Sequence, residues 1–224
     1  MSRSRIQRSL ERLDAITRRL RRDCPWDREQ DERSIVPHTV EEAYELADAV
    51  EAGDDTKLVD ELGDVLFQVH FLALLLEERG GGDLGAVAER CTEKLIRRHP
   101  HVFGDAQART AGEVLRNWDA IKRQEPGRSP GLFADVPQNL PALLLARKVQ
   151  RLAASGGSDG AGDAESLAER CRDVQGLEGA ARDRRHAAVG ELLFAAVAVA
   201  RRLEVDPELA LRAAARRFQA RAPR

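Results

Sequence analysis

The strongest structural signal in the chain is the segment 54–79, which reads DDTKLVDELGDVLFQVHFLALLLEER. Its apolar residues recur at intervals of three and four, the spacing that places side chains on one face of an α-helix. They are Leu58, Leu62, Val65, Leu66, Val69, Leu72 and Leu76. Asp54 or Asp55 can cap the first turn, and three consecutive glycines follow the last one. The segment therefore predicts one long helix whose apolar face is buried against other helices.

The same pattern recurs on both sides of this segment. Alternating apolar residues and the two-residue turns of β-hairpins, the usual signals of strands, are almost absent. We expect helices at about 4–22, 38–52, 55–79, 83–98, 111–124, 140–154, 165–180, 186–203 and 206–221. Short connections between such helices favour an antiparallel bundle. The predicted fold class is all-α.

The composition excludes several classes of protein. The chain has 224 residues, of which 42 % are hydrophobic and 33 % charged, as in soluble globular proteins. Its 36 basic and 38 acidic side chains nearly cancel, so no overall field favours nucleic acid or a membrane surface. The longest apolar run, residues 192–200, is too short to span a membrane, and the arginine-rich start does not resemble a secretory signal. We therefore expect a cytoplasmic protein that binds neither nucleic acid nor membranes.

Two stretches predict boundaries between helical modules. Residues 125–141 hold four prolines, and residues 155–163 are rich in glycine and serine, which are compositions typical of connections. The predicted organisation is a helical module at 1–125, a connection at 126–163 that includes the short helix 140–154, and a second helical module at 164–224.

Four acidic residues have a spacing that could build a metal site. Glu42 and Glu45 share one helix face, and Glu61 and Asp64 share a face of the next helix. If the two helices pack antiparallel, the four carboxylates converge, which is unfavourable without a counter-charge. Ligands that are all oxygen favour Mg²⁺ first and Mn²⁺ second. Solvated acidic helix faces produce the same spacing without a metal, so the spacing leaves both interpretations open.

Basic and aromatic residues further along the chain could accompany such a site. Lys94 and Arg98 lie four residues apart on one predicted helix, Trp118 and Lys122 lie four apart on another, and Lys57 precedes Glu61 by one turn. Cations suit a polyphosphate, and an aromatic ring offers a face to a base. Surface solubility and core packing explain the same residues equally well.

Two further residues favour structural roles. The segment Cys24-Pro25-Trp26-Asp27 predicts a compact turn with Trp26 packed against the body of the protein. His70 lies on the apolar side of its helix and is expected to be a hydrogen-bonded residue of the core.

Taken in order, these motifs resemble the MazG family over about residues 5–125. The motifs are Cys24-Pro25-Trp26-Asp27, Glu41-Glu42-Ala43-Tyr44-Glu45, Asp60-Glu61-Leu62-Gly63-Asp64, the run EKLIRRHPHVFGD at 93–105, and Asn117-Trp118. Each motif is weak alone, but their occurrence in this order is specific.

The resemblance implies an all-α nucleoside triphosphate pyrophosphohydrolase, usually a homodimer, that uses Mg²⁺ to convert an NTP and water into an NMP and pyrophosphate. Water would attack the α-phosphorus, and the role would be house-cleaning of the nucleotide pool. The metal ligands implied are Glu42, Glu45, Glu61 and Asp64, with Glu41 beside them to orient or deprotonate water. The triphosphate contacts implied are Lys57, Lys94 and Arg98, and the nucleotide contacts are Trp118 and Lys122. His38 stands where the family often carries a lysine.

The second half of the chain echoes the first. Residues 190–194 (GELLF) resemble 63–67 (GDVLF), and residues 206–221 align without gaps on 83–98. Counted back without gaps from Glu191, which matches Asp64, the positions opposite Glu42, Glu45 and Glu61 hold Glu169, Arg172 and Ala188. Because two of four carboxylates are missing, we expect tandem copies of which the second is degenerate and structural.

Two alternatives to a broad NTP pyrophosphohydrolase remain. One is an enzyme of the same type restricted to damaged or non-standard nucleotides. The other is a non-catalytic helical dimer that binds nucleotides and serves a regulatory role.

Overall fold

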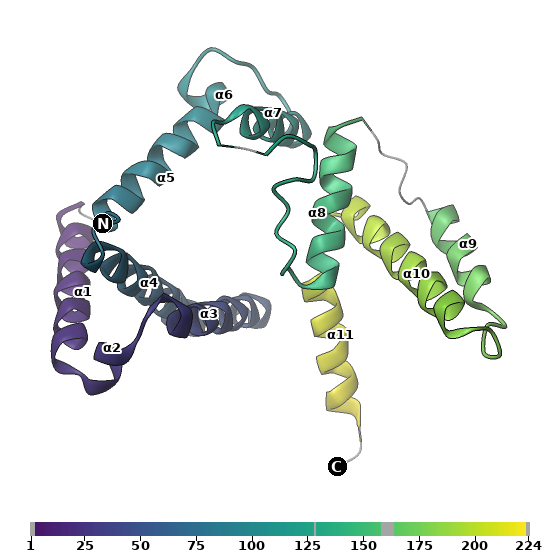
Figure 1. Cartoon of the computed structure of the whole chain (residues 1–224), viewed down its shortest axis with the longest axis horizontal. Coiled ribbons are helices and arrows are strands. Elements are labelled where there is room, and N and C mark those ends of the chain that lie inside the picture. Colours follow the sequence, from purple (N-terminus) through teal and green to yellow (C-terminus); the bar gives the residue numbers. More distant parts are fainter. Residues whose placement is uncertain (1–2, 128, 158–163, 223–224) are drawn as a thin grey trace. The chain divides into compact units, whose positions relative to one another are not determined.

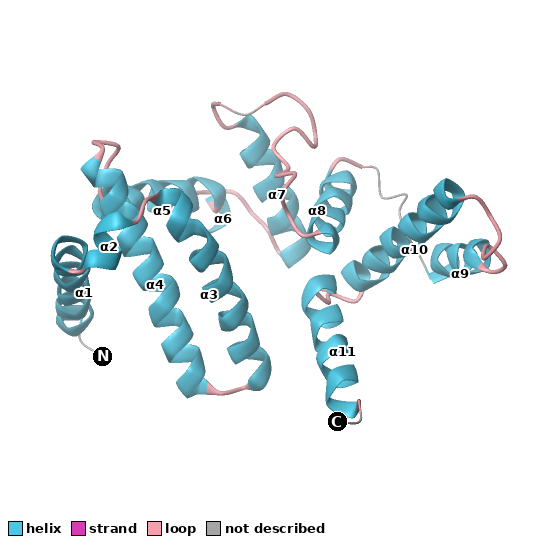
Figure 2. Cartoon of the chain, turned by 60° about the horizontal axis from the view of Figure 1, so that its bottom comes forward, coloured by secondary structure: helices cyan, strands magenta, loops and turns pink. Residues whose placement is uncertain are grey.

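The computed structural model describes residues 3–127, 129–157 and 164–222, and within these ranges its regular structure is entirely helical (Figures 1 and 2). The helices are α1 (Arg3–Asp23), α2 (Pro25–Glu29), α3 (Glu32–Ala52), α4 (Asp55–Glu78), α5 (Leu84–Arg98), α6 (Pro100–Phe103), α7 (Ala111–Gln124), α8 (Ala142–Ser155), α9 (Ala164–Val174), α10 (Arg182–Arg202) and α11 (Pro207–Arg221). The all-α prediction is confirmed. In the described part of the chain no helix has the length and hydropathy needed to cross a membrane. Most of the expected glycine-rich linker, 158–163, lies outside the described residues.

The chain divides into two compact units, Met1–Arg97 and Arg98–Arg224. The first unit is organised around α3 and α4, which lie side by side as a hairpin (Figure 2). Gly53 adopts a left-handed conformation with φ of 66° and ends α3, a geometry that a residue without a β-carbon adopts easily. The side chain of Asp54 then accepts hydrogen bonds from the backbone N–H groups of Thr56 and Lys57, which caps α4.

The core of the first unit lies between these two helices. Ile35 of α3 packs with Phe71 and Leu75 of α4, all three almost fully buried, and Phe67 and Leu72 cover them partly. Burying an aliphatic or aromatic side chain of this kind contributes about 1.5–3 kcal/mol to the free energy of folding. Of the seven residues expected on the apolar face of the segment 54–79, only Leu72 takes part in this core, and Leu62, Leu66 and Val69 are between 38 and 50 % exposed. The expectation that the whole face is buried is therefore wrong, and the core is built instead around Phe71 and Leu75.

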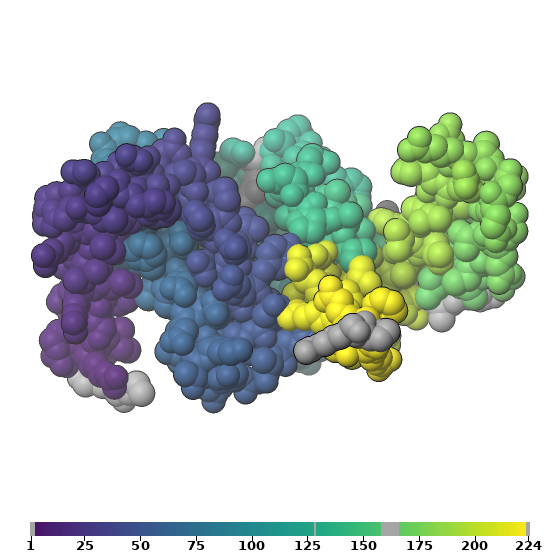
Figure 3. All heavy atoms as spheres, turned by 90° about the horizontal axis from the view of Figure 1, so that it is seen from below, coloured from purple at the N-terminus to yellow at the C-terminus, as the bar shows by residue number. Residues whose placement is uncertain are grey.

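Two arginines of α1 form ion pairs with glutamates at the C-terminal end of α4. Arg18 donates two hydrogen bonds to the carboxylate of Glu77, at 3.0 and 2.6 Å. Arg21 does the same to Glu78, both at 2.8 Å, and also donates to the backbone carbonyls of Asp27 and Gln30. Figure 3 shows α1, in purple, as a column of atoms at the edge of this unit. These contacts hold α1, α2 and α4 together.

The second unit is organised around α8 and α10. Gln150 of α8 is almost fully buried, and its Nε2 donates to the backbone carbonyl of Phe194 in α10 at 2.8 Å. Arg147 of α8 forms an ion pair with Asp206, whose side chain also caps α11. Helix α9 packs against α10 in a second helical pair (Figure 1).

Several helix boundaries differ from those expected. Helix α3 begins at Glu32 and not at 38, because Asp31 and Ser34 form a capping box upstream and Pro37 is accommodated inside the helix. Helix α9 ends at Val174 and not at 180, because Gly176 takes a left-handed conformation with φ of 73°. Helix α10 starts at Arg182, four residues earlier than expected. The short helices α2 and α6 were not predicted.

Candidate metal centre

The hairpin of α3 and α4 brings three glutamates together. One carboxylate oxygen from each of Glu42, Glu45 and Glu61 lies within 4.8 Å of the other two. Glu42 and Glu45 follow each other at a spacing of three on α3, and Glu61 faces them from α4, as the turn at Gly53 requires. Glu42 and Glu61 are half-buried and Glu45 is exposed. Three oxygen donors from two helices therefore converge on a point open to solvent on one side.

The fourth expected ligand, Asp64, is not in this group of three, but its charge acts on the site. Partial burial raises the pKa of Glu42, and neighbouring carboxylates, of which Asp64 has the largest effect, raise it further. The pKa of Glu61 is raised in the same way, by desolvation first and then by Glu45 and Asp64. The charges of all four carboxylates thus act on one another, although only three of the side chains belong to the converging group.

A cation fits this arrangement. The donor set consists only of carboxylate oxygens, the ligands that hard divalent cations such as Mg²⁺ and Mn²⁺ prefer. The raised pKa values of Glu42 and Glu61 show that the folded protein holds negative charge here at a cost, which a bound cation would remove. Lys57 supplies some positive charge, because it lowers the pKa of Glu61 against the other effects.

The residues next to the cluster form a chain of contacts. Oε2 of Glu41 lies 3.7 Å from Nδ1 of His38, and both side chains are largely exposed. The ring of Trp26 meets the ring of His38 edge to face at 5.9 Å. Trp26 is 51 % exposed, so the expectation that it packs against the body of the protein is wrong. Trp26 belongs to α2, and Arg21 fixes this helix by donating hydrogen bonds to the backbone carbonyls of Asp27 and Gln30. The indole ring itself stays open to solvent.

His70 lies in the core, as its place on the apolar side of α4 predicted. Its Nδ1, however, is buried without a hydrogen-bond partner among the described residues. The expectation that His70 is hydrogen-bonded is therefore wrong for Nδ1.

The expected substrate contacts divide between the two units. Lys57 and Lys94 belong to the first unit with the carboxylates, whereas Arg98, Trp118 and Lys122 belong to the second. Lys94 is half-buried on α5, and Lys57 is exposed on α4.

Arg98 has a structural partner that the sequence did not reveal. Its guanidinium donates two hydrogen bonds to the carboxylate of Glu125 and lies over the ring of Trp118, 5.1 Å from the centroid. His99 meets the same ring edge to face at 5.0 Å. No local spacing signals the partnership of Arg98 with Glu125, because the two residues are 27 positions apart.

An all-α fold with a carboxylate cluster across a helical hairpin defines a helical protein with a candidate site for a divalent cation. Comparison with known proteins identifies the family. Residues 30–103 match the model of the MazG nucleotide pyrophosphohydrolase domain, a range that includes all four carboxylates, Lys57 and Lys94.

Relatives match over most of the chain. A nucleoside triphosphate pyrophosphohydrolase of Escherichia coli (strain K12) is 38 % identical over 95 % of this chain and 85 % of its own length. A nucleoside triphosphate pyrophosphohydrolase/pyrophosphatase MazG of Thermotoga maritima is 40 % identical over 93 % of this chain and 82 % of its own length. A crystal structure of a mazG-related protein from Thermotoga maritima is 28 % identical, with a TM-score of 0.45, over 51 % of this chain and 99 % of that one. The chain belongs to the MazG family of nucleoside triphosphate pyrophosphohydrolases.

Proposed function

We propose that this chain hydrolyses nucleoside triphosphates to nucleoside monophosphates and pyrophosphate, with water attacking the α-phosphorus. The observation that carries the proposal is the convergence of Glu42, Glu45 and Glu61 within 4.8 Å in a chain of this family. Its role in the cell would be to remove unwanted nucleotides from the pool.

Glu42, Glu45, Glu61 and Asp64 are the residues that would hold the metal. When bound there, Mg²⁺, or Mn²⁺ in its place, would neutralise charge on phosphate oxygens and lower the pKa of a bound water. The carboxylates themselves repel a phosphate group, so a phosphate can approach them only where a bound cation would lie between the two. The partial burial of Glu42 and Glu61 strengthens this repulsion, since charges interact more strongly away from bulk water.

Glu41 is the candidate for orienting the attacking water and accepting its proton. Its carboxylate is exposed beside the cluster and free of any arginine partner among the described residues. His38, 3.7 Å away, can hold the Glu41 side chain toward one side of the helix. A base must lie within hydrogen-bonding reach of the proton that it removes, and an exposed carboxylate next to the metal ligands meets that condition.

The proposed substrate contacts rest on correspondence with the family and on charge. Lys57, Lys94 and Arg98 would bind the triphosphate, and Trp118 and Lys122 the nucleoside. The electrostatic effect of Lys57 on Glu61 supports its place beside the cluster. The half-buried ring of Trp118, with Arg98 above it, supports an aromatic surface of the kind that a base can contact.

The second helical pair, α9 and α10, is proposed to be a degenerate copy with a structural role. The two helices pack against each other, and among the described residues they bring no three carboxylates together. Oε2 of Glu169 instead forms an ion pair with Nη2 of Arg170 at 3.3 Å. On this proposal the catalytic module is 1–125, followed by a connection at 126–163 and the altered copy at 164–224.

A homodimer is proposed from the apolar surface of α4. Val59, Leu62, Leu66 and Val69 follow one another at spacings of three and four, and each is between 38 and 68 % exposed. A stripe of this kind on a helix of the catalytic hairpin is suited to packing against a second copy.

The proposed chemistry is tested by hydrolysis in ¹⁸O-labelled water with Mg²⁺ and a panel of normal and modified NTPs. Attack at the α-phosphorus places the label in the NMP. Label in the pyrophosphate would show attack at the β-phosphorus and would overturn the proposed mechanism. Nucleotide binding without turnover of any substrate would instead support the regulatory alternative.

A further inference from the structure

The second unit contains a pocket that is separate from the carboxylate cluster. It has a volume of about 360 Å³ and lies between the C-terminal half of α7, the loop 129–135 and α8. This volume is within the range of small-molecule sites. Its charged lining residues are Asp119, Lys122, Arg123, Asp135, Lys148 and Arg151.

The charges that line the pocket do not balance. Asp119 is 3 % exposed and forms an ion pair with Arg151, so these two charges cancel within the wall. The remaining lining charges are three cationic side chains and the carboxylate of Asp135. Of the three cations, Arg123 and Lys148 form no ion pair within the described residues, so their two positive charges remain at the wall.

Two of the cations are well placed to receive a ligand. Nη1 of Arg123 donates to the hydroxyl of Ser155 at 3.3 Å, a neutral partner that leaves its charge uncompensated. Lys148 is half-buried on α8 and has no ion-pair partner in the described ranges. Ser129 also lines the pocket.

We propose that this pocket binds a phosphate-bearing anion through Arg123 and Lys148. Phosphate groups carry several negative charges on oxygens that an arginine can bind through two N–H groups and a lysine as a point charge. The imbalance of the lining matches such a ligand, and the pocket is large enough for two linked phosphates.

The pocket is distinct from the proposed nucleotide contact on the same helix. Trp118 does not line it and faces Arg98 and His99 instead. Lys122 lies between the two surfaces of α7, since it lines the pocket and is also a proposed nucleotide contact. For this reason the test leaves Lys122 unchanged.

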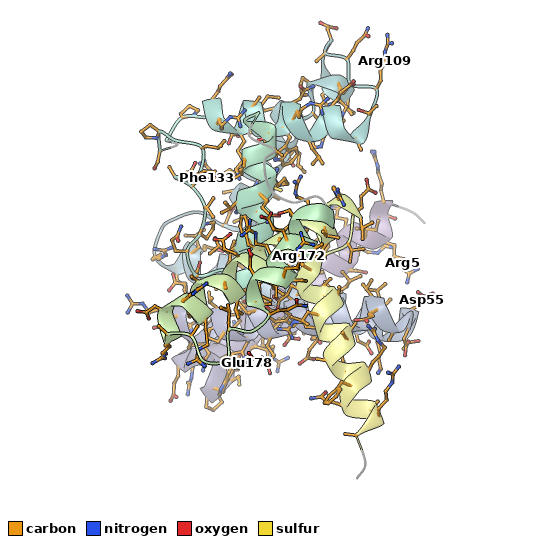
Figure 4. All side chains as sticks on the ribbon, turned by 90° about the vertical axis from the view of Figure 1, so that its right-hand side faces the viewer. Arg5, Asp55, Arg109, Phe133, Arg172 and Glu178 are labelled. Atoms are coloured by element: carbon orange, nitrogen blue, oxygen red, sulfur yellow. The ribbon has the colours of Figure 1, made fainter. Side chains whose placement is uncertain are left out.

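The test is calorimetric titration of the metal-free full chain with inorganic pyrophosphate. Without a cation the carboxylate cluster repels the anion, so the titration measures binding elsewhere. The variant is Arg123→Gln with Lys148→Gln. The charge-matched control is Arg90→Gln with Arg109→Gln, because Arg90 is exposed on α5 and Arg109 stands apart from the loop that carries Phe133 (Figure 4).

We expect the dissociation constant of pyrophosphate to rise at least about tenfold in the variant and to stay unchanged in the control. Equal affinity in wild type, variant and control would overturn the proposal. If the double variant unfolds, Lys148→Gln alone serves, since this side chain has no ion pair to lose. The same outcomes then apply. The titration involves no turnover, so its result is independent of whether the proposed hydrolysis is correct.

Discussion

The guanidinium of Arg98 and the carboxylate of Glu125 are joined by two parallel hydrogen bonds, of 2.9 and 2.5 Å, and both side chains are more than nine-tenths buried. This pair links the end of α5 to the end of α7 and holds the guanidinium over Trp118. Any triphosphate contact made by Arg98 must therefore share a group that already has a structural partner.

Loss of this pair is expected to be costly. Arg98→Ala leaves the carboxylate of Glu125 buried without its cation, so the free energy of unfolding should fall by about 3–5 kcal/mol. Urea denaturation followed by circular dichroism measures the change. As a control, Arg170→Ala removes a more exposed pair with Asp173 and should cost less than about 1 kcal/mol. Similar losses in the two variants would argue against a structural role for the pair.

The contact between Arg21 and Glu78 predicts a dependence on pH. Arg21 holds the pKa of Glu78 below its ordinary value of 4.5, so the pair stabilises the fold above that pH. The contribution is lost as the pH falls through the lowered pKa of the folded state. Arg21→Ala should therefore be less stable than wild type at pH 7, and the difference should shrink below pH 4. A difference that stays constant between pH 7 and pH 3 would show that the backbone contacts of Arg21 account for its effect.

The carboxylate cluster predicts the opposite dependence on pH for the metal-free protein. The pKa of Glu42 in the folded state is raised above its ordinary value of 4.5, so its contribution favours folding at low pH and is lost as the pH rises through the raised pKa. At pH 7 the ionised side chain destabilises the fold. Metal-free Glu42→Gln should therefore be more stable than metal-free wild type at pH 7, by at most about 1 kcal/mol given its exposure.

Addition of Mg²⁺ should reverse that order. A ligand that binds only the folded state stabilises it by about 2.7 kcal/mol at a concentration one hundred times its dissociation constant. Thermal unfolding with and without Mg²⁺ measures both effects. If Mg²⁺ shifts the midpoint of wild type and Glu42→Gln equally, the cation does not bind at the cluster.

The exposed stripe on α4 predicts the oligomeric state. Leu62→Glu places a charge at the centre of the stripe, where the side chain is 50 % exposed, so folding of the chain should be unaffected while a dimer is lost. Light scattering coupled to size-exclusion chromatography should give the mass of a dimer for wild type and of a monomer for the variant. Val87→Glu, a partly exposed position on α5, is the matched control and should remain dimeric. A monomeric wild type would contradict the proposed interface.

The parts of the fold that were predictable are those with local causes. The long helix α4 and the cap at Asp54 depend on residues within a few positions of one another, and the sequence contains them all. The start of α3 was misplaced by six residues, because the capping box of Asp31 and Ser34 begins the helix upstream of Pro37, which the helix accommodates. The exposure of Trp26 could not be predicted, since it depends on the hydrogen bonds that Arg21 donates to the backbone carbonyls of Asp27 and Gln30, which fix the position of α2.

The candidate site shows the same limit. The spacing of the acidic residues predicted convergence on the condition that the two helices pack antiparallel, and three of the four expected carboxylates, those of Glu42, Glu45 and Glu61, do converge. The partnership of Arg98 with Glu125 depends on tertiary packing across 27 residues and has no local signature. The pocket that contains Lys148 was missed for the same reason, because three separate segments build its wall.

The most direct test of the account is separation of the products formed from an NTP in the presence of Mg²⁺, with wild type, Glu45→Gln and Glu89→Gln compared. Glu45→Gln removes one of the three converging carboxylates, whereas Glu89→Gln makes the same change of charge at an exposed position on α5. We expect NMP and pyrophosphate from wild type and Glu89→Gln, and a loss of at least about a hundredfold in rate for Glu45→Gln with its helical content intact. Full activity in Glu45→Gln, or NDP and phosphate as the products of wild type, would contradict the account.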